Sequence, residues 1–211
     1  MPRKPQFTKE EIAEYGLDIV RKQGMECLTT RELAKHLGTT VAPIFVHYPT
    51  MDELKKAVRG LARNIYRDYI HQGLAEAIPF RGVGMQYIQF AKNEPELYRL
   101  LFLSDNTEDA KESHFAMDEL AYTQDLVRES LQSIYNMNAV AADHYFRDLW
   151  LVAHSLATLL VTGGCTYTDD EIRSIFTEIS VSICKAYKEI PGLVEGTYDV
   201  DKTFQKLVSK S

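Results

Sequence analysis

The chain has 211 residues, of which 45% are hydrophobic and 26% are charged. This composition is typical of a globular protein with a hydrophobic core, and it excludes a disordered chain, a collagen-like repeat and a small disulfide-stabilised protein. The net charge of −6 at first argues against a nucleic-acid binder, because such proteins are often basic.

Helical patterns dominate the first third of the chain. Three Thr-x-x-Glu capping boxes mark helix starts, because each threonine can accept a hydrogen bond from a backbone N–H of the first turn. Gly24, Gly38 and Pro49 interrupt the helical periodicity between these starts. The expected helices are residues 9–23, 30–36, 41–48 and 51–77, with Thr8, Thr29, Thr40 and Thr50 as their N-caps.

The rest of the chain also lacks the alternating pattern of β-strands, so we expect an all-α fold. We expect a break at residues 79–84 and a polar, acidic loop at 104–111. Residues 149–161 are the most apolar stretch but are too short to span a bilayer, so no membrane segment is expected. The expected helices are residues 83–93, 95–103, 113–135, 139–162 and 169–188, followed by a short one at 202–208.

Residues 28–48, LTTRELAKHLGTTVAPIFVHY, contain the most informative pattern. Two short helices separated by a glycine-containing turn have the form of a helix-turn-helix, in which the second helix enters the DNA major groove. Helices this short are marginal alone and need packing partners. The expected packing residues are Leu33, Ala34, Leu37, Ile44 and Phe45, which would hold both helices against residues 9–23.

This segment resembles the DNA-binding domain of the TetR family of bacterial regulators. Residues 84–91 and 94–102 resemble, more weakly, the regulatory region of a branch with a WHG-type C-terminal region. The resemblance implies an all-helical homodimer that represses transcription until a small molecule binds its C-terminal domain. The three widely spaced cysteines, Cys27, Cys165 and Cys184, favour a cytoplasmic protein. The matching positions are Gly24, Thr29, Arg31, Leu33, Ala34, Gly38, Ile44, Phe45, His47 and Tyr48.

The helix-turn-helix supplies the expected DNA contacts. Arg31 is the best candidate for a bidentate bond to guanine O6 and N7. The resemblance makes His47 a phosphate ligand, with a packed histidine as the alternative, and Thr30 is either a phosphate ligand or only a cap. Apolar residues at the front of the second helix would read thymine methyl groups or DNA shape. The complete expected set is Thr30, Arg31, Thr40, Val41, Ala42, Pro43, Phe45, His47 and Lys55.

Two residues depart from the family pattern. Phe45 stands where the family usually has a tyrosine, and Met51 where it usually has a lysine, so two phosphate contacts are missing. Either DNA binding is weaker than usual, or Lys55 and Lys56, one turn later, and the arm Arg3-Lys4 compensate. A helical dimer that binds a protein partner and has lost DNA binding is therefore a competing hypothesis. An enzyme is a further alternative, but no catalytic or dinucleotide-binding motif supports it.

The second half of the chain is rich in aromatic residues and methionine, which suit a pocket for flat apolar ligands. Most of these side chains are expected to belong to the core, and His154 is the most conspicuous polar group among them. No metal site and no cofactor is expected, since His144 and Asp148 alone do not make a metal site. The candidate effector pocket consists of Met85, Tyr87, Phe90, Phe102, Met117, Tyr122, Trp150 and His154.

Two domains are expected. Residues 1–53 would bind DNA, with a linker helix to about residue 77, and residues 54–211 would bind the ligand and dimerise through the helices at 139–162 and 169–188. Residues 1–72 contain twelve Lys or Arg and nine Asp or Glu, so the excess of acidic residues lies in the second half. A symmetric dimer would place its two recognition helices one DNA turn apart on a near-palindromic operator.

Overall fold

The computed structural model describes residues 7–103 and 115–209, and the regular structure within these ranges is entirely helical. The expected all-α fold is therefore confirmed. Arg3, Lys4, Ser113 and the expected loop at 104–111 lie outside the described residues. The helices are α1 (Lys9–Gln23), α2 (Thr30–His36), α3 (Ala42–His47), α4 (Met51–Leu74), α5 (Pro79–Asn93), α6 (Pro95–Tyr98), α7 (Phe115–Ile134), α8 (Ala139–Thr162), α9 (Asp169–Glu189) and α10 (Val200–Val208), with short 3-10 and π segments at Met25–Cys27 and Arg99–Leu103.

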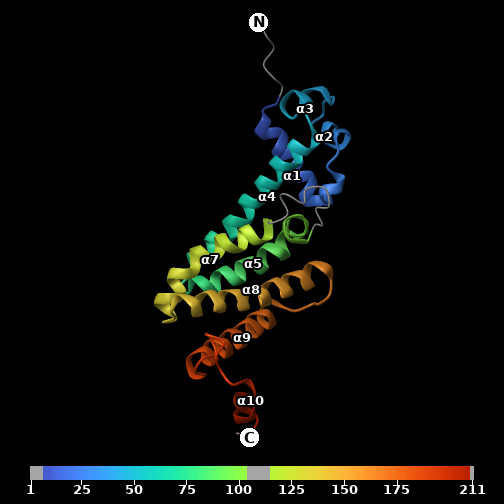
Figure 1. Ribbon diagram of the computed structural model, residues 1–211. Helices are drawn as coiled ribbons and strands as arrows, with labels where there is room; N and C mark the ends of the chain where they lie inside the picture. The colour runs from blue at the N-terminus through green and yellow to red at the C-terminus, as the bar shows by residue number, and fades with distance from the viewer. Residues whose placement is uncertain (1–6, 104–114, 210–211) are drawn as a thin grey trace.

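The helices form an elongated molecule with two unlike ends (Figure 1). Helices α1, α2 and α3 gather at one end, and α9 and α10 lie at the other. Helix α4 runs from the first group toward the middle of the molecule, where α5 contacts both α4 and α8. Within the described residues, no helix combines the length and the apolar character needed to cross a membrane.

Helix starts agree with the capping predictions in most places. The Thr8 hydroxyl accepts a hydrogen bond from the Glu11 N–H, and the Glu11 carboxylate accepts one from the Thr8 N–H, which completes the capping box. Thr29 and Thr50 cap α2 and α4 in the same way through their hydroxyl groups. Thr40 is a correction: Val41 is the N-cap residue of α3, and no side chain caps that helix.

Three helix boundaries differ from the prediction. The expected break at 79–84 is wrong, because α5 begins at Pro79. Proline is compatible with the first turn of a helix, where its missing N–H has no intrahelical partner. Helix α4 ends at Leu74 rather than near residue 77, and the segment expected as one helix at 95–103 divides into α6 and a π-helix.

Helices α4 and α5 cross at a pair of glycines. A Cβ atom placed on Gly73 would lie 2.5 Å from the Val83 nitrogen, and one on Gly82 would lie 2.2 Å from the Gly73 carbonyl oxygen. Such distances are far below van der Waals contact, so the two backbones approach this closely only because both residues lack a side chain. The crossing therefore fixes the end of α4 that is remote from α2 and α3.

Among the ion pairs that join different helices, two involve a buried carboxylate. Arg21 of α1 donates two hydrogen bonds to the Glu94 carboxylate at the start of α6, and Glu94 is buried. Glu119 of α7 is fully buried and accepts hydrogen bonds from Arg63 and Arg67 of α4. Helix α4 is thus tied to α7, while α1 is tied to the junction of α5 and α6.

Candidate nucleic-acid interface and apolar cavity

The turn between α2 and α3 is held from behind by buried apolar side chains. Leu33, Leu37 and Ile44 are buried in the core shared with α1. Tyr48, just after α3, is 3% exposed, and its hydroxyl donates a hydrogen bond to the Lys9 carbonyl at 3.0 Å. Because α3 has only six residues, these contacts rather than helix propensity determine its position.

The opposite side of this unit faces solvent. Arg31, Thr40, Val41, Ala42 and Phe45 are exposed. The remaining expected contacts, Thr30, Pro43, His47 and Lys55, are half-buried. All nine expected contact residues thus belong to one end of the molecule, far from α9 and α10 (Figure 1).

The structure separates Thr29 from Thr30. The Thr29 hydroxyl accepts the hydrogen bond from the Glu32 N–H at 3.2 Å, so Thr29 is the cap and Thr30 is the first residue of α2. The alternative interpretation of Thr30 as the cap residue is therefore wrong. Its hydroxyl is free of that structural role.

The front of α3 is more apolar than the sequence pattern suggested. Phe45 was expected in the packing face, but 44% of it is exposed, which is a correction to that part of the prediction. Val41 and Val46 are 43% and 73% exposed, and Val46 was not among the expected contacts. Six residues make fewer than two helical turns, so only Ile44 of this helix is buried.

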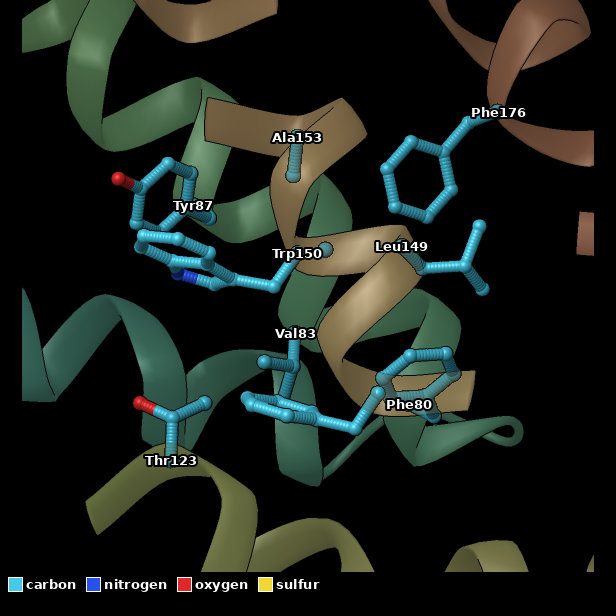
Figure 2. Close-up of a pocket in the computed structure, with 10 residues that line it drawn as sticks. Phe80, Val83, Tyr87, Thr123, Leu149, Trp150, Ala153 and Phe176 are labelled. Carbon is cyan, nitrogen blue, oxygen red and sulfur yellow. The ribbon is translucent and has the colours of Figure 1, made fainter. Parts of the chain in front are cut away.

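An apolar cavity lies between α5, α7, α8 and α9 (Figure 2). Its open space is about 20 Å³, room for roughly one water molecule. No charged side chain is among the described residues that line it. The lining residues are Phe80, Val83, Gly84, Tyr87, Thr123, Phe146, Leu149, Trp150, Ala153 and Phe176.

A polar cluster adjoins this cavity. The hydroxyls of Tyr87 and Tyr98 lie 2.9 Å and 3.1 Å from Nδ1 of His154, and the Tyr98 hydroxyl lies 3.0 Å from Oγ1 of Thr158. Burial raises the pKa of both tyrosines and lowers the pKa of His154. All three groups are therefore uncharged at neutral pH, and hydrogen bonds at His154 Nδ1 join the two tyrosine hydroxyls to the imidazole ring. The indole of Trp150 stacks on the His154 ring, with centroids 4.9 Å apart.

The structure brings together four of the eight expected pocket residues. Tyr87 and Trp150 line the cavity, while Phe102 and His154 lie beside them in one aromatic cluster. Phe90 is fully buried against Tyr66. The other three do not line the cavity: Met85 is half-buried, Met117 is 58% exposed, and Tyr122 lies under the Arg67 guanidinium with its hydroxyl 2.8 Å from His71 Nε2.

Sequence reasoning missed several residues of this site. Tyr98 and Thr158 complete the polar cluster, and Phe176 reaches the cavity from α9. Thr158 follows His154 by four residues, the spacing that places two side chains on one helix face, so this signal was present in the sequence. Phe176 had no comparable signal, because its contact with α5 depends on how distant helices pack.

Comparison with known proteins identifies the C-terminal region. Residues 80–181 match the family model of the Tetracyclin repressor-like, C-terminal domain. All ten residues that line the cavity fall within the matched range. No curated protein matches the chain.

Proposed function

Because the chain belongs to the TetR family of bacterial transcriptional regulators, we propose that it represses transcription by binding a near-palindromic DNA operator as a homodimer. A small molecule that binds within residues 54–211 would release the operator. In this proposal residues 1–53 form the DNA-binding domain, and α4 links it to the rest of the chain.

The observation that carries the proposal is that α2 and α3 are buried on one side and exposed to solvent on the other. Buried Leu33, Ile44 and Tyr48 hold the pair rigidly, while Arg31 is exposed beside it. A rigid helix pair with an exposed guanidinium can enter a major groove about 12 Å wide and bond guanine O6 and N7. Thr30 and Thr40 would bind phosphate together with backbone N–H groups, and His47 and Lys55 would add further phosphate contacts.

The exposed apolar front of α3 suits direct contact with bases. Val41, Ala42 and Pro43 cannot donate side-chain hydrogen bonds, so they would contact thymine methyl groups or follow the shape of the groove. Phe45, at 44% exposure, would extend that apolar surface instead of donating a phosphate contact. Met51 is partly buried against the core, and its uncharged side chain supplies no ionic phosphate contact at this end.

Homodimerisation through α8 and α9 is supported by apolar side chains that the single chain leaves uncovered. Leu151 and Leu159 of α8 are 52% and 41% exposed, and Val181 of α9 is 60% exposed. Exposed apolar residues on two adjacent helices are typical of an interface. A two-fold dimer would then present two copies of α3 to one face of the DNA.

The proposal is tested by titrating the protein with DNA from upstream of its own gene, using fluorescence anisotropy at several salt concentrations. We expect saturable binding that weakens as salt increases, because phosphate contacts release counterions. Arg31→Ala should cost about 1–3 kcal/mol and relax preference at one base pair. Lys202→Ala, an equal charge change at an exposed position on α10, outside the proposed DNA and dimer surfaces, is the matched control and should leave binding unchanged.

The same titration decides between the main proposal and the alternative. The exposed Val41, Phe45 and Val46 on α3 favour an alternative in which this surface binds a protein partner. If no DNA binds even at low salt, the repressor proposal is wrong and this alternative stands. If Arg31→Ala weakens all sequences equally, Arg31 contacts phosphate rather than a base.

A further inference from the structure

The cavity between α5, α7, α8 and α9 has a mainly apolar lining. Five of the described residues that line it are aromatic, and none of the described lining side chains carries a charge. We propose that this cavity binds an uncharged, apolar compound with a single ring, and that the ring of this compound takes the place of the Phe176 side chain. The inference rests on the proposed function, because it names the class of effector.

Among the described residues that line the cavity, the hydroxyls of Thr123 and Tyr87 are already engaged in hydrogen bonds within the protein. The Thr123 hydroxyl donates to the Glu119 carbonyl oxygen at 2.8 Å and lies 3.3 Å from the Tyr66 hydroxyl. The Tyr87 hydroxyl is engaged with His154 Nδ1. A charged ligand would therefore lose its hydration without an ionic partner among the described lining residues, which weakens its binding. An apolar ligand meets no such cost.

The existing open space is too small for a ring. Apolar cavities that hold benzene measure on the order of 150 Å³, whereas the open space here is about 20 Å³. A ring therefore fits only if one of the lining side chains moves away. In Figure 2 the Phe176 ring reaches the cavity from its own helix, opposite the aromatic side chains of α5 and α8.

Phe176 is the lining side chain best able to move. Its ring packs against α5 at Gly84, which has no side chain. A Cβ atom placed on Gly84 would lie only 2.8 Å from Phe176 Cζ. The other nine lining residues come from α5, α7 and α8. Helix α9, by contrast, fully buries only Phe176 and Ile172.

The remaining contacts of α9 with the body are partly apolar and partly polar. Ile175, Ile179 and Ile183 are only partly buried against the core, and the polar contacts lie near the surface. The polar contacts include bonds from Tyr145 to Ser180 and from Tyr187 to Asp148. Polar contacts near the surface exchange with water at little cost, so the main cost of a shift of α9 is the burial of its apolar side chains, of which Phe176 and Ile172 are the most deeply buried. A ring bound in that place restores the lost apolar contacts. Because α9 belongs to the proposed dimer interface, occupation of the cavity would change the spacing of the two DNA-binding ends.

Trp150 provides a direct readout, since it lines the cavity and is the only tryptophan of the chain. The full-length protein is titrated with propylbenzene, with 4-propylbenzoate and with 4-propylphenyltrimethylammonium, which share a ring and differ in charge. We expect a saturable blue shift of Trp150 emission with propylbenzene. Binding of either charged analogue should be weaker by about tenfold or more. Equal binding of all three, or no binding of propylbenzene, overturns the proposal.

Two variants test the role of Phe176. Phe176→Ala should bind propylbenzene about tenfold or more tightly, because the space is then already open. Ile172→Ala is the matched control, since it removes the other buried anchor of α9 without opening the cavity. If both variants gain affinity equally, loosening of α9 rather than removal of the ring is responsible, and the role given to Phe176 is wrong. Operator binding is measured separately, so a failure of the repressor proposal is distinguishable from a failure of this one.

Discussion

The ion pair between α4 and α7 gives the sharpest stability prediction. Glu119 is fully buried, and its Oε1 accepts a hydrogen bond from Arg63 Nε at 2.6 Å. Arg67 donates to both carboxylate oxygens, at 2.9 Å each. Glu119→Gln keeps the shape of the side chain but removes its charge and replaces one acceptor oxygen by an NH₂ donor.

The magnitude follows from these three contacts. Each hydrogen bond to a charged group contributes about 1.5–3 kcal/mol, and the substitution removes one and weakens the other two. Two effects offset this loss: a full charge is no longer buried, and the arginine side chains, each 33% exposed, can regain water. We therefore expect Glu119→Gln to lower the free energy of unfolding by about 2 kcal/mol, which corresponds to a decrease in Tm of roughly 4–8 °C.

Urea denaturation followed by circular dichroism measures this change. Glu129→Gln, on the exposed face of the same helix, is the matched control and should change stability by less than about 0.5 kcal/mol. In a double-mutant cycle, Arg67→Ala should cost less in the Glu119→Gln background than in the wild type. Equal costs in the two backgrounds, or a Glu119→Gln protein as stable as the control, would refute the reasoning.

Three further predictions concern other parts of the molecule. Arg21→Ala leaves the buried Glu94 carboxylate without its bidentate partner and should lower the free energy of unfolding by about 1–2 kcal/mol in urea denaturation. Burial lowers the pKa of His154 in the folded state, so the unfolded chain binds the proton more readily. The free energy of unfolding should therefore fall as the pH decreases below about 6.5. His154→Gln should remove this part of the pH dependence in unfolding titrations between pH 5 and 8. Gly60→Ala, where nothing lies within 4 Å of the new Cβ, should raise Tm and increase the free energy of unfolding by about 0.5–1 kcal/mol. Gly73→Ala at the helix crossing should lower Tm and decrease the free energy of unfolding by about 1–3 kcal/mol. Scanning calorimetry compares the two variants.

Local signals in the sequence predicted most helix starts. Thr8 and Glu11 lie three residues apart, so the bonds between them depend on one turn of helix and on nothing distant. The errors arose where a local signal permits two outcomes. Pro79 fits both a break and a first helical turn. Thr40 suits an N-cap, but the packing of Ile44 begins α3 two residues later.

The candidate sites were predictable to different degrees. The spacing of residues 28–48 predicted the short helices α2 and α3 and the exposure of Arg31, because this segment is contiguous in sequence. The role of Arg31 in DNA binding stays a prediction. Within the cavity, composition pointed to Tyr87 and Trp150 but also to Met117, which is largely exposed. Phe176 was missed, because its contact with Gly84 joins positions far apart in the chain. Which aromatic side chains converge is decided by helix packing, and composition does not contain that information.

The glycine crossing of α4 and α5 also determines how far the opposite end of α4 moves when the helix tilts. From Gly73 to Met51, α4 extends for about 33 Å at 1.5 Å per residue, and the bonds of Arg63 and Arg67 to Glu119 hold it against α7 between these two residues. A tilt of α4 by about 5° at Gly73 would displace its Met51 end by about 3 Å. That displacement is close to the rise of about 3.4 Å between successive base pairs. If residues 1–53 bind DNA as proposed, a tilt of this size near the crossing would move the opposite end of the helix by about one step along the DNA.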